Sequence, residues 1–134
     1  IVESAGEKLR MLPAEGEWSV LELLGHMVDA ELMQGVRMRM ILAEDDVQLA
    51  GYDQDEFVRV QKHNHTDPQP LLRALEALRP VHVALWQSLS PEDRQRSGLH
   101  AERGHETLET TYRMLAGHDV FHIDQMRKTL EAVS

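Results

Sequence analysis

Apolar residues recur at helical spacing along most of the chain, and the longest such stretch follows a strong helix start at Ser19. Glu22 stands three residues later, so the two form a capping box, in which each side chain accepts a hydrogen bond from the other's backbone N–H. The pattern predicts a helix from there to about Ala43. Its apolar face consists of Val20, Leu23, Leu24, Met27, Val28, Met33, Val36, Met40 and Ile41. Polar residues, among them His26 and Glu31, interrupt that face.

One further helix is predicted before this one and another after it. Residues 2–12 carry apolar side chains at helical spacing, and Pro13 would end that helix. Asp67 followed by proline is a typical helix start, with aspartate as the N-cap and proline at the first helical position. Leucines spaced alternately by four and three continue this helix to about Leu89, with a kink expected at Pro80.

A last helix is predicted from the N-cap Thr107 to about Ala132. Between the second and third helices, residues 44–70 are the least regular part of the chain, and Asp53 or Asp55 could cap a short helix there. Residues 94–104 are expected to form a polar connection.

Four main helices in a chain of 134 residues predict a single all-α domain that spans residues 1–134. The expected arrangement is an antiparallel four-helix bundle with a short extra helix between helices 2 and 3. Aromatic residues make up 4% of the chain, and β-branched residues are sparse, which also favours helices over strands.

Composition and charge exclude several classes of function. With 14 basic and 23 acidic residues, the net charge of −9 would repel phosphate backbones, so nucleic-acid binding is not expected. No apolar run approaches the ~20 residues of a membrane span, and no signal peptide opens the chain, so we expect a cytoplasmic protein without membrane contact. The chain has no cysteine. Any metal must therefore bind imidazole or carboxylate, and any reacting thiol must come from another molecule.

His118 and His122 are the most informative pair of residues. One turn apart in the predicted last helix, they project from the same face and could share one divalent cation. The glutamate that serves as general base in His-Glu-x-x-His zinc proteases is absent, so that class is excluded. Chance alone would produce about half such a pair among eight histidines, so a metal site needs a third ligand.

His26 is the candidate for that third ligand, because it lies in the middle of the long helix among apolar neighbours. Facing helices of a bundle lie ~8–10 Å apart, and inward side chains from two helices can meet at one cation. A core histidine that donates to a backbone carbonyl is the alternative. His82 has an equal claim by spacing, although a satisfied, half-buried imidazole is the favoured interpretation for it.

The remaining histidines lie in loop-like sequence, where surface positions are expected. They are His63, His65, His100 and His105, of which His100 or His105 could lie over the mouth of a pocket. Asp29 and Glu31 are either carboxylates that orient a ligating imidazole or solvated charges.

Several blocks of the sequence resemble DinB-like proteins, the DinB/YfiT superfamily of proposed metalloenzymes. Residues 16–26 (GEWSVLELLGH), followed by Asp-Ala-Glu at 29–31, are similar to that family's "GEWS…H" block. Residues 51–55 (GYDQD) resemble the segment that follows the family's second helix. His118 and His122, with Gln125, resemble its C-terminal H-x-x-x-H block. The resemblance covers most of the chain, in the right order.

This resemblance implies a four-helix bundle in which His26, His118 and His122 hold one divalent metal ion, with Zn, Ni, Fe or Mn as candidates. It also implies a homodimer, and a first helix that is usually longer than residues 2–12. Members of known activity include S-transferases and isomerases that depend on small thiols such as bacillithiol or mycothiol.

The leading hypothesis is therefore a metal-dependent S-transferase that joins a small thiol cosubstrate to a small electrophile. Asp29, Glu31 and His100 are the candidates for a catalytic base. A metal-dependent hydrolase is the alternative enzyme. A bundle that binds metal without catalysis, or a metal-free interaction domain, is the alternative to an enzyme.

Overall fold

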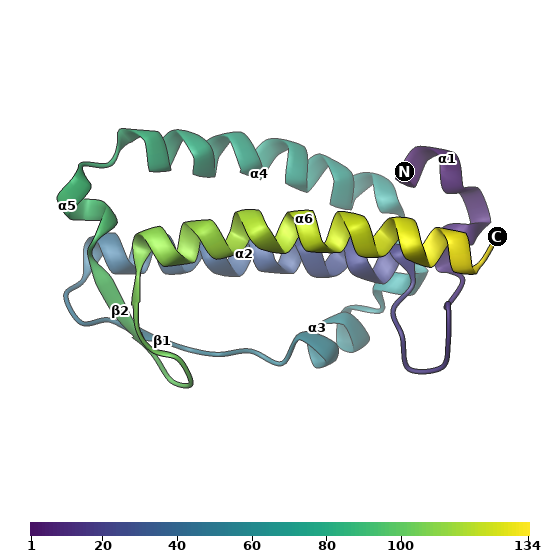
Figure 1. Cartoon of the computed structure of the whole chain (residues 1–134), viewed down its shortest axis with the longest axis horizontal. Coiled ribbons are helices and arrows are strands. Elements are labelled where there is room, and N and C mark those ends of the chain that lie inside the picture. The colour runs from purple at the N-terminus through teal and green to yellow at the C-terminus, as the bar shows by residue number, and fades with distance from the viewer.

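Three long helices run along the molecule in the computed structural model, which describes all 134 residues (Figure 1). They are α2 (Val20–Ala43), α4 (Pro68–Ser88) and α6 (Leu108–Ala132). α2 packs against both of the others. α2 and α4 run in the same direction, and α6 runs antiparallel to both (Figure 1).

The predicted starts of these helices are confirmed by their caps. The Ser19 side chain accepts a hydrogen bond from the Glu22 N–H, and the Glu22 carboxylate accepts one from the Ser19 N–H, which completes the capping box. The Asp67 side chain accepts from the Gln69 N–H at the start of α4, and the Thr107 hydroxyl accepts from the Thr110 N–H at the start of α6. α4 continues as one helix across Pro80.

The first segment differs from the single helix predicted for residues 2–12. It forms one turn of helix, α1 (Val2–Ala5), and then the 3-10 helix η1 (Gly6–Arg10). The chain changes course at Gly6, whose φ of 55° is in the left-handed region that glycine adopts without steric cost. Arg10 then donates to the backbone carbonyls of Asn64 and Thr66, which ties this segment to the connection before α4.

The connection between α2 and α4 returns the chain to the end of the bundle where α2 began (Figure 1). It contains the expected short helix α3 (Gln54–Gln61), capped by Asp53, and the 3-10 helix η2 (His63–His65). The Ser19 hydroxyl donates to the side-chain oxygen of Asn64 at 2.7 Å, so α4 starts beside the start of α2. This return is what makes α2 and α4 parallel.

A small sheet replaces the polar connection that was predicted for residues 94–104. After the short helix α5 (Pro91–Arg94), β2 (Ser97–His100) pairs antiparallel with β3 (Gly104–Thr107) and parallel with β1 (Gln48–Leu49). The sheet lies at the end of the bundle where α2 finishes and α6 begins (Figure 1). The protein is therefore mostly, but not entirely, helical.

The core consists of two separate apolar clusters with a polar region between them. One contains Leu9, Val20, Leu21, Leu23, Leu24, Met27 and Met126, and the other contains Met38, Ile41, Val47, Leu49 and Leu108. Between Met27 and Met38, the buried side chains of α2 include Asp29, Glu31, Gln34 and Arg37. No helix of the protein combines the length and apolar character that crossing a membrane requires.

We predict that Gly25→Ala destabilises the fold. A Cβ at Gly25 would lie 2.3 Å from the ring of His63, and the resulting overpacking is expected to cost roughly 1–3 kcal/mol. Gly117→Ala is the matched control, because Gly117 is also helical and nothing lies within 4 Å of its Cβ position. There, better helix propensity should stabilise by up to about 1 kcal/mol. Urea unfolding measures both, and a Gly25→Ala variant as stable as wild type would contradict the close packing of His63 on α2.

Candidate metal centre

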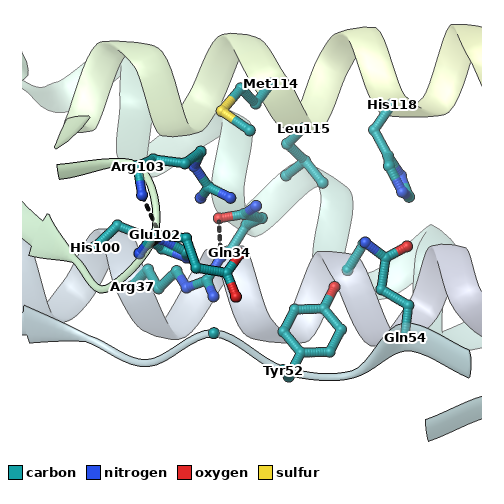
Figure 2. Close-up of a pocket in the computed structure, with 12 residues that line it drawn as sticks. Gln34, Arg37, Tyr52, Gln54, His100, Glu102, Arg103, Met114, Leu115 and His118 are labelled. Atoms are coloured by element: carbon teal, nitrogen blue, oxygen red, sulfur yellow. Dashed lines mark hydrogen bonds between the residues drawn. The ribbon is translucent and has the colours of Figure 1, made fainter. Parts of the chain in front are cut away.

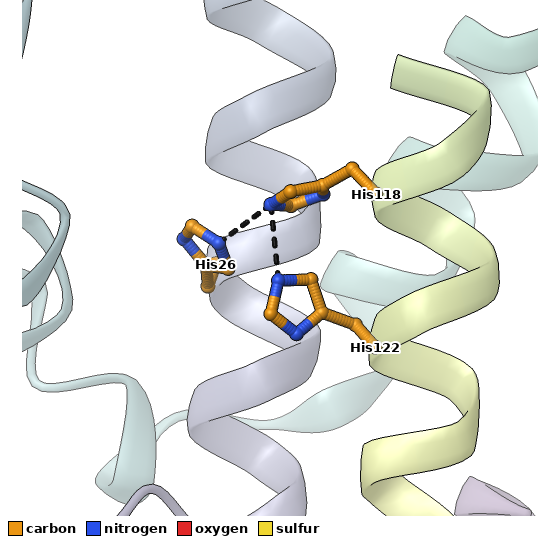
Figure 3. Close-up of side chains that lie close together, drawn as sticks. All are labelled: His26, His118 and His122. Atoms are coloured by element: carbon orange, nitrogen blue, oxygen red, sulfur yellow. Dashed lines mark hydrogen bonds between the residues drawn. The ribbon is translucent and has the colours of Figure 1, made fainter. Parts of the chain in front are cut away.

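His26, His118 and His122 meet between α2 and α6 (Figure 3). The capping box at Ser19 sets the start of α2, and His26 lies about two turns further on with its side chain buried. His118 and His122 are one turn apart on α6 and project toward α2, as their i,i+4 spacing predicts. The His26 ring lies inside the bundle, with 1% of the residue exposed.

The Nε2 atoms of the three rings face one another. His118 Nε2 lies 2.7 Å from His26 Nε2 and 3.0 Å from His122 Nε2, and the ligand atoms of the set lie within 4.8 Å of one another. Three such atoms cannot all be joined by hydrogen bonds, because His118 Nε2 carries at most one proton to share between two neighbours. Nitrogens bonded to one cation at ~2.1 Å in tetrahedral geometry lie ~3.4 Å apart. The two distances from His118 Nε2 are slightly shorter than this, so a small outward movement of the rings lets the set hold a single divalent ion.

A hydrogen bond from α6 orients the His122 ring. His122 Nδ1 lies 2.9 Å from the side-chain oxygen of Gln125, which can only accept, so Nδ1 carries the proton. The lone pair is then on Nε2, the atom that faces the other rings. Outer hydrogen bonds of this kind are typical of histidines that bind metals.

Burial keeps the cluster uncharged. It lowers the pKa of His26 to about 3, with smaller contributions from the rings of His118 and His122. Burial also lowers the pKa of His118 to about 4, with His122 adding to the effect. For His122, burial lowers the pKa while the hydrogen bond with Gln125 raises it. All three imidazoles are therefore neutral at pH 7, the form in which imidazole binds a metal.

Asp29 and Glu31, the predicted carboxylate candidates, are buried and have other partners. Asp29 accepts from the side chain of Gln61 and pairs with His63 Nε2 at 3.0 Å. Glu31 pairs with His82 Nδ1 at 2.6 Å on the side of α2 that faces α4. Neither is a solvated charge, and neither contacts an imidazole of the cluster.

Glu31 belongs to a buried polar network that reaches α6. Arg79 on α4 contacts the Glu31 carboxylate at 3.3 Å and the Asp119 carboxylate at 2.7 Å. Burial raises the pKa of Asp119 to about 6, with Arg79 opposing the shift. His82 has a hydrogen-bond partner, as predicted, but that partner is the remote Glu31 and the ring is fully buried instead of half-buried.

The expectation of surface positions for the loop histidines is wrong for two of them. His63 is buried because the absence of a side chain at Gly25 lets its ring lie directly on α2. His100 is buried because it ends the central strand β2. His65 and His105 are exposed, as predicted.

His100 and His118 line the same cavity, which has a volume of about 160 Å³ (Figure 2). Besides these two, its walls include Ala30, Gln34, Arg37, Gly51, Tyr52, Gln54, Glu102, Arg103, Met114 and Leu115. Of His100 and His105, the two candidates for a position over a pocket mouth, His100 lines this cavity and His105 does not. Arg37 was not identified from the sequence as a candidate functional residue. Its charge, on the inward side of a long apolar helix, is the signal that could have indicated it.

Comparison with known proteins identifies the family. A sequence profile of the DinB superfamily matches residues 3–126. The chain belongs to the DinB superfamily. The resemblance noted from its GEWS and H-x-x-x-H blocks is confirmed.

Relatives within the superfamily are distant in sequence and close in structure. "Putative metal-dependent hydrolase OB0782" from Oceanobacillus iheyensis is 24% identical over 123 residues, which cover 92% of this chain and 71% of that protein. "Putative metal-dependent hydrolase YfiT" from Bacillus subtilis is 24% identical over 110 residues, which cover 81% of this chain and 62% of that protein.

The solved structure of YfiT, described as "a probable metal-dependent hydrolase with an unusual four-helix bundle topology", has a TM-score of 0.87 at 22% identity. It covers 96% of this chain and 77% of the YfiT chain. This likeness confirms the predicted four-helix bundle fold.

We predict that acid destabilises the metal-free protein more than its His118→Ala variant. The pKa values of His26 and His118 lie below the unfolded value of 6.5, so the unfolded state binds protons first and stability falls as pH falls from 6.5 toward 4. The raised pKa of Asp119 has the opposite effect, because its contribution to protein stability is lost as pH rises through about 6. Both proteins contain Asp119, so this contribution cancels in the comparison. The free energy of unfolding, measured with urea at pH 7 and at pH 4.5, should fall by on the order of 2 kcal/mol more in the wild type than in His118→Ala. Equal losses would contradict buried neutral imidazoles.

Proposed function

We propose that His26, His118 and His122 hold one divalent cation, and that the protein is a metal-dependent S-transferase acting on a small thiol and a small electrophile. The convergence of the three rings, in which His118 Nε2 lies 2.7 Å from His26 Nε2 and 3.0 Å from His122 Nε2, is the observation that carries this proposal. The names of the relatives, which refer to metal-dependent hydrolases, agree with a metal ion.

A divalent ion held only by neutral ligands keeps its full charge, and it lowers the pKa of a thiol or water molecule that binds it. The chain contributes the rest of the site. The three imidazoles provide ligand atoms from two rigid helices, and Gln125 keeps the His122 lone pair directed at the centre. The cavity beside His118 provides space for a small substrate.

The groups around the cavity favour a thiol over water as nucleophile. Asp29 and Glu31 are held by His63 and His82, so neither is free to take a proton there, and Glu102 is the only carboxylate among the lining residues. A free thiol has a pKa of ~8.5, against ~15.7 for water, so it ionises with much less help from a base. Because the chain has no cysteine, this thiol must be a cosubstrate.

A metal-dependent hydrolase is the second candidate, and the names of the relatives favour it. In that reaction a water molecule replaces the thiol. His100, which is buried in the wall of the cavity, is then the group of this chain best placed to contact the reacting molecule.

We predict that Gln125→Ala weakens metal binding about 10–100-fold, because His122 loses the hydrogen bond that directs its Nε2 atom. Gln125→Glu keeps an acceptor at that position and should retain most of the affinity. Competition with a chromophoric chelator measures both variants. Equal metal affinity in wild type and Gln125→Ala would show that His122 is oriented by packing alone.

We predict that the purified protein transfers small thiols to electrophiles only when it is loaded with metal. The assay uses a panel of thiols and activated alkyl or aryl electrophiles, before and after chelation and reloading. His118→Ala should lose metal and at least 100-fold in activity, because removal of a ligand leaves two imidazoles. His105→Ala, an exposed histidine, is the control. Turnover that survives complete removal of metal would end the proposal, and ester or amide hydrolysis without a thiol would select the hydrolase.

A further inference from the structure

We propose that the cavity beside the metal centre binds the carboxylate of a small substrate through Arg37 and His100. This inference rests on the proposed function, since the reacting end of the same molecule would then face the three imidazoles. Four observations support it: a buried cation without a carboxylate partner, an unpaired buried N–H, their common cavity, and the charges around it (Figure 2).

Arg37 is a buried cation without a carboxylate partner. Only 4% of the residue is exposed, and no aspartate or glutamate oxygen lies within 4.0 Å of its guanidinium nitrogens. It donates to the Ala50 carbonyl at 2.5 Å and weakly to the Gln34 side chain at 3.4 Å, while its Nε–H has no partner in the protein. A guanidinium has five N–H donors, so most of them are unused. The guanidinium lies over the Tyr52 ring at 5.6 Å, and the nearby Glu106 carboxylate favours its charge without contacting it. A buried charge without a directly bonded counter-ion is costly, and a bound anion would supply one.

His100 supplies a second unpaired donor. Its Nδ1 atom accepts the backbone N–H groups of Glu102 and Arg103, both at 3.2 Å, so its proton is on Nε2. That Nε2 atom is buried and has no partner in the protein. Burial lowers the pKa of His100, with the nearby arginines adding to the effect, so the ring remains a neutral donor at pH 7.

The charges around the cavity suit a single negative charge. Arg103 donates to the buried Glu106 carboxylate at 2.8 Å, so that pair neutralises itself, and Glu102 is exposed to solvent. Arg37 is then the one lining cation without a direct counter-ion. A monoanionic carboxylate matches it in charge and in the planar geometry of its fork, whereas a phosphate dianion would bring excess charge toward Glu102 and Glu106.

The position of the cavity defines the kind of substrate. His118 lines the same cavity from α6, at the end away from Arg37 and His100, so a molecule held at the arginine extends toward the metal centre (Figure 2). Either the thiol or the electrophile could carry the carboxylate. The experiment separates these sources.

The first test uses metal-free, ¹⁵N-labelled protein, so it does not depend on the proposed metal. Propionate should shift the Arg37 Nε–H and His100 Nε2–H resonances saturably, and propionamide should not. Arg37→Gln should weaken propionate binding at least tenfold, while Arg39→Gln, which removes the same charge from an exposed position on α2, should not change it. If Arg37→Gln does not fold, the inference is tested by the wild-type titration together with Arg37→Lys, which keeps the charge but loses the planar fork and should bind propionate more weakly.

The second test uses cobalt-loaded protein and the thiolate-to-cobalt absorption. Mercaptocarboxylates of increasing length should bind at least tenfold more tightly than 2-mercaptoethanol, and Arg37→Gln should remove that preference without changing cobalt content. If mercaptocarboxylates bind no more tightly than 2-mercaptoethanol, but propionate binds in the first test, the electrophile and not the thiol carries the carboxylate.

Three outcomes would overturn the inference. Propionate that leaves both resonances unmoved excludes the subsite, and unchanged propionate affinity in a less stable Arg37→Gln variant shows a purely structural arginine. Tighter binding of inorganic phosphate than of propionate excludes the carboxylate assignment. Failure to bind cobalt refutes the proposed metal centre and leaves the first test to decide on Arg37.

Discussion

The structure depends on satisfying the polar side chains that α2 buries in the middle of its length. Between its two apolar clusters, this helix is covered by neighbours, so each polar group there must find a partner inside the protein. Gln34 contacts Arg37 on the same helix, and the other four find their partners on different elements. His26 meets α6, Asp29 meets η2 and α3, Glu31 meets α4, and Arg37 meets the connection that follows β1.

These contacts stabilise the fold, and they also determine where the surrounding elements pack against α2. A buried carboxylate that loses its partner costs roughly 3–5 kcal/mol, which is a large part of the stability of a small domain. An arrangement that moved α4 away from Glu31, or η2 away from Asp29, would leave such a charge alone. Gly25 and Gly35 allow the arrangement, because the rings of His63 and His82 occupy the space where their side chains would be.

Much of the bundle and its metal centre could be predicted from local sequence, because caps and helical spacing are local signals. Ser19, Asp67 and Thr107 marked the three long helices, and the i,i+4 spacing of His118 and His122 placed both rings on one face. His26 could only be proposed, since its direction depends on the packing of α2 against α6.

The features that could not be predicted depend on contacts between distant segments. The strand at residues 97–100 pairs with residues 48–49, and no local pattern of β-branched residues announces it. The common direction of α2 and α4 follows from the return of the chain through α3, which the irregular sequence of residues 44–70 did not indicate. Burial of His63 and His100 likewise requires partners that are remote in sequence.

Helices carry the proposed metal ligands, whereas loops form much of the cavity that would bind the substrate. The imidazoles stand on α2 and α6, whereas much of the cavity wall comes from the turn between β2 and β3 and from the segment that follows β1. Such loops vary in length and composition more freely than packed helices do. Exchange of these two segments among homologous proteins could therefore alter substrate choice while the cation-binding helices stay unchanged, which makes them natural targets for redesigning selectivity.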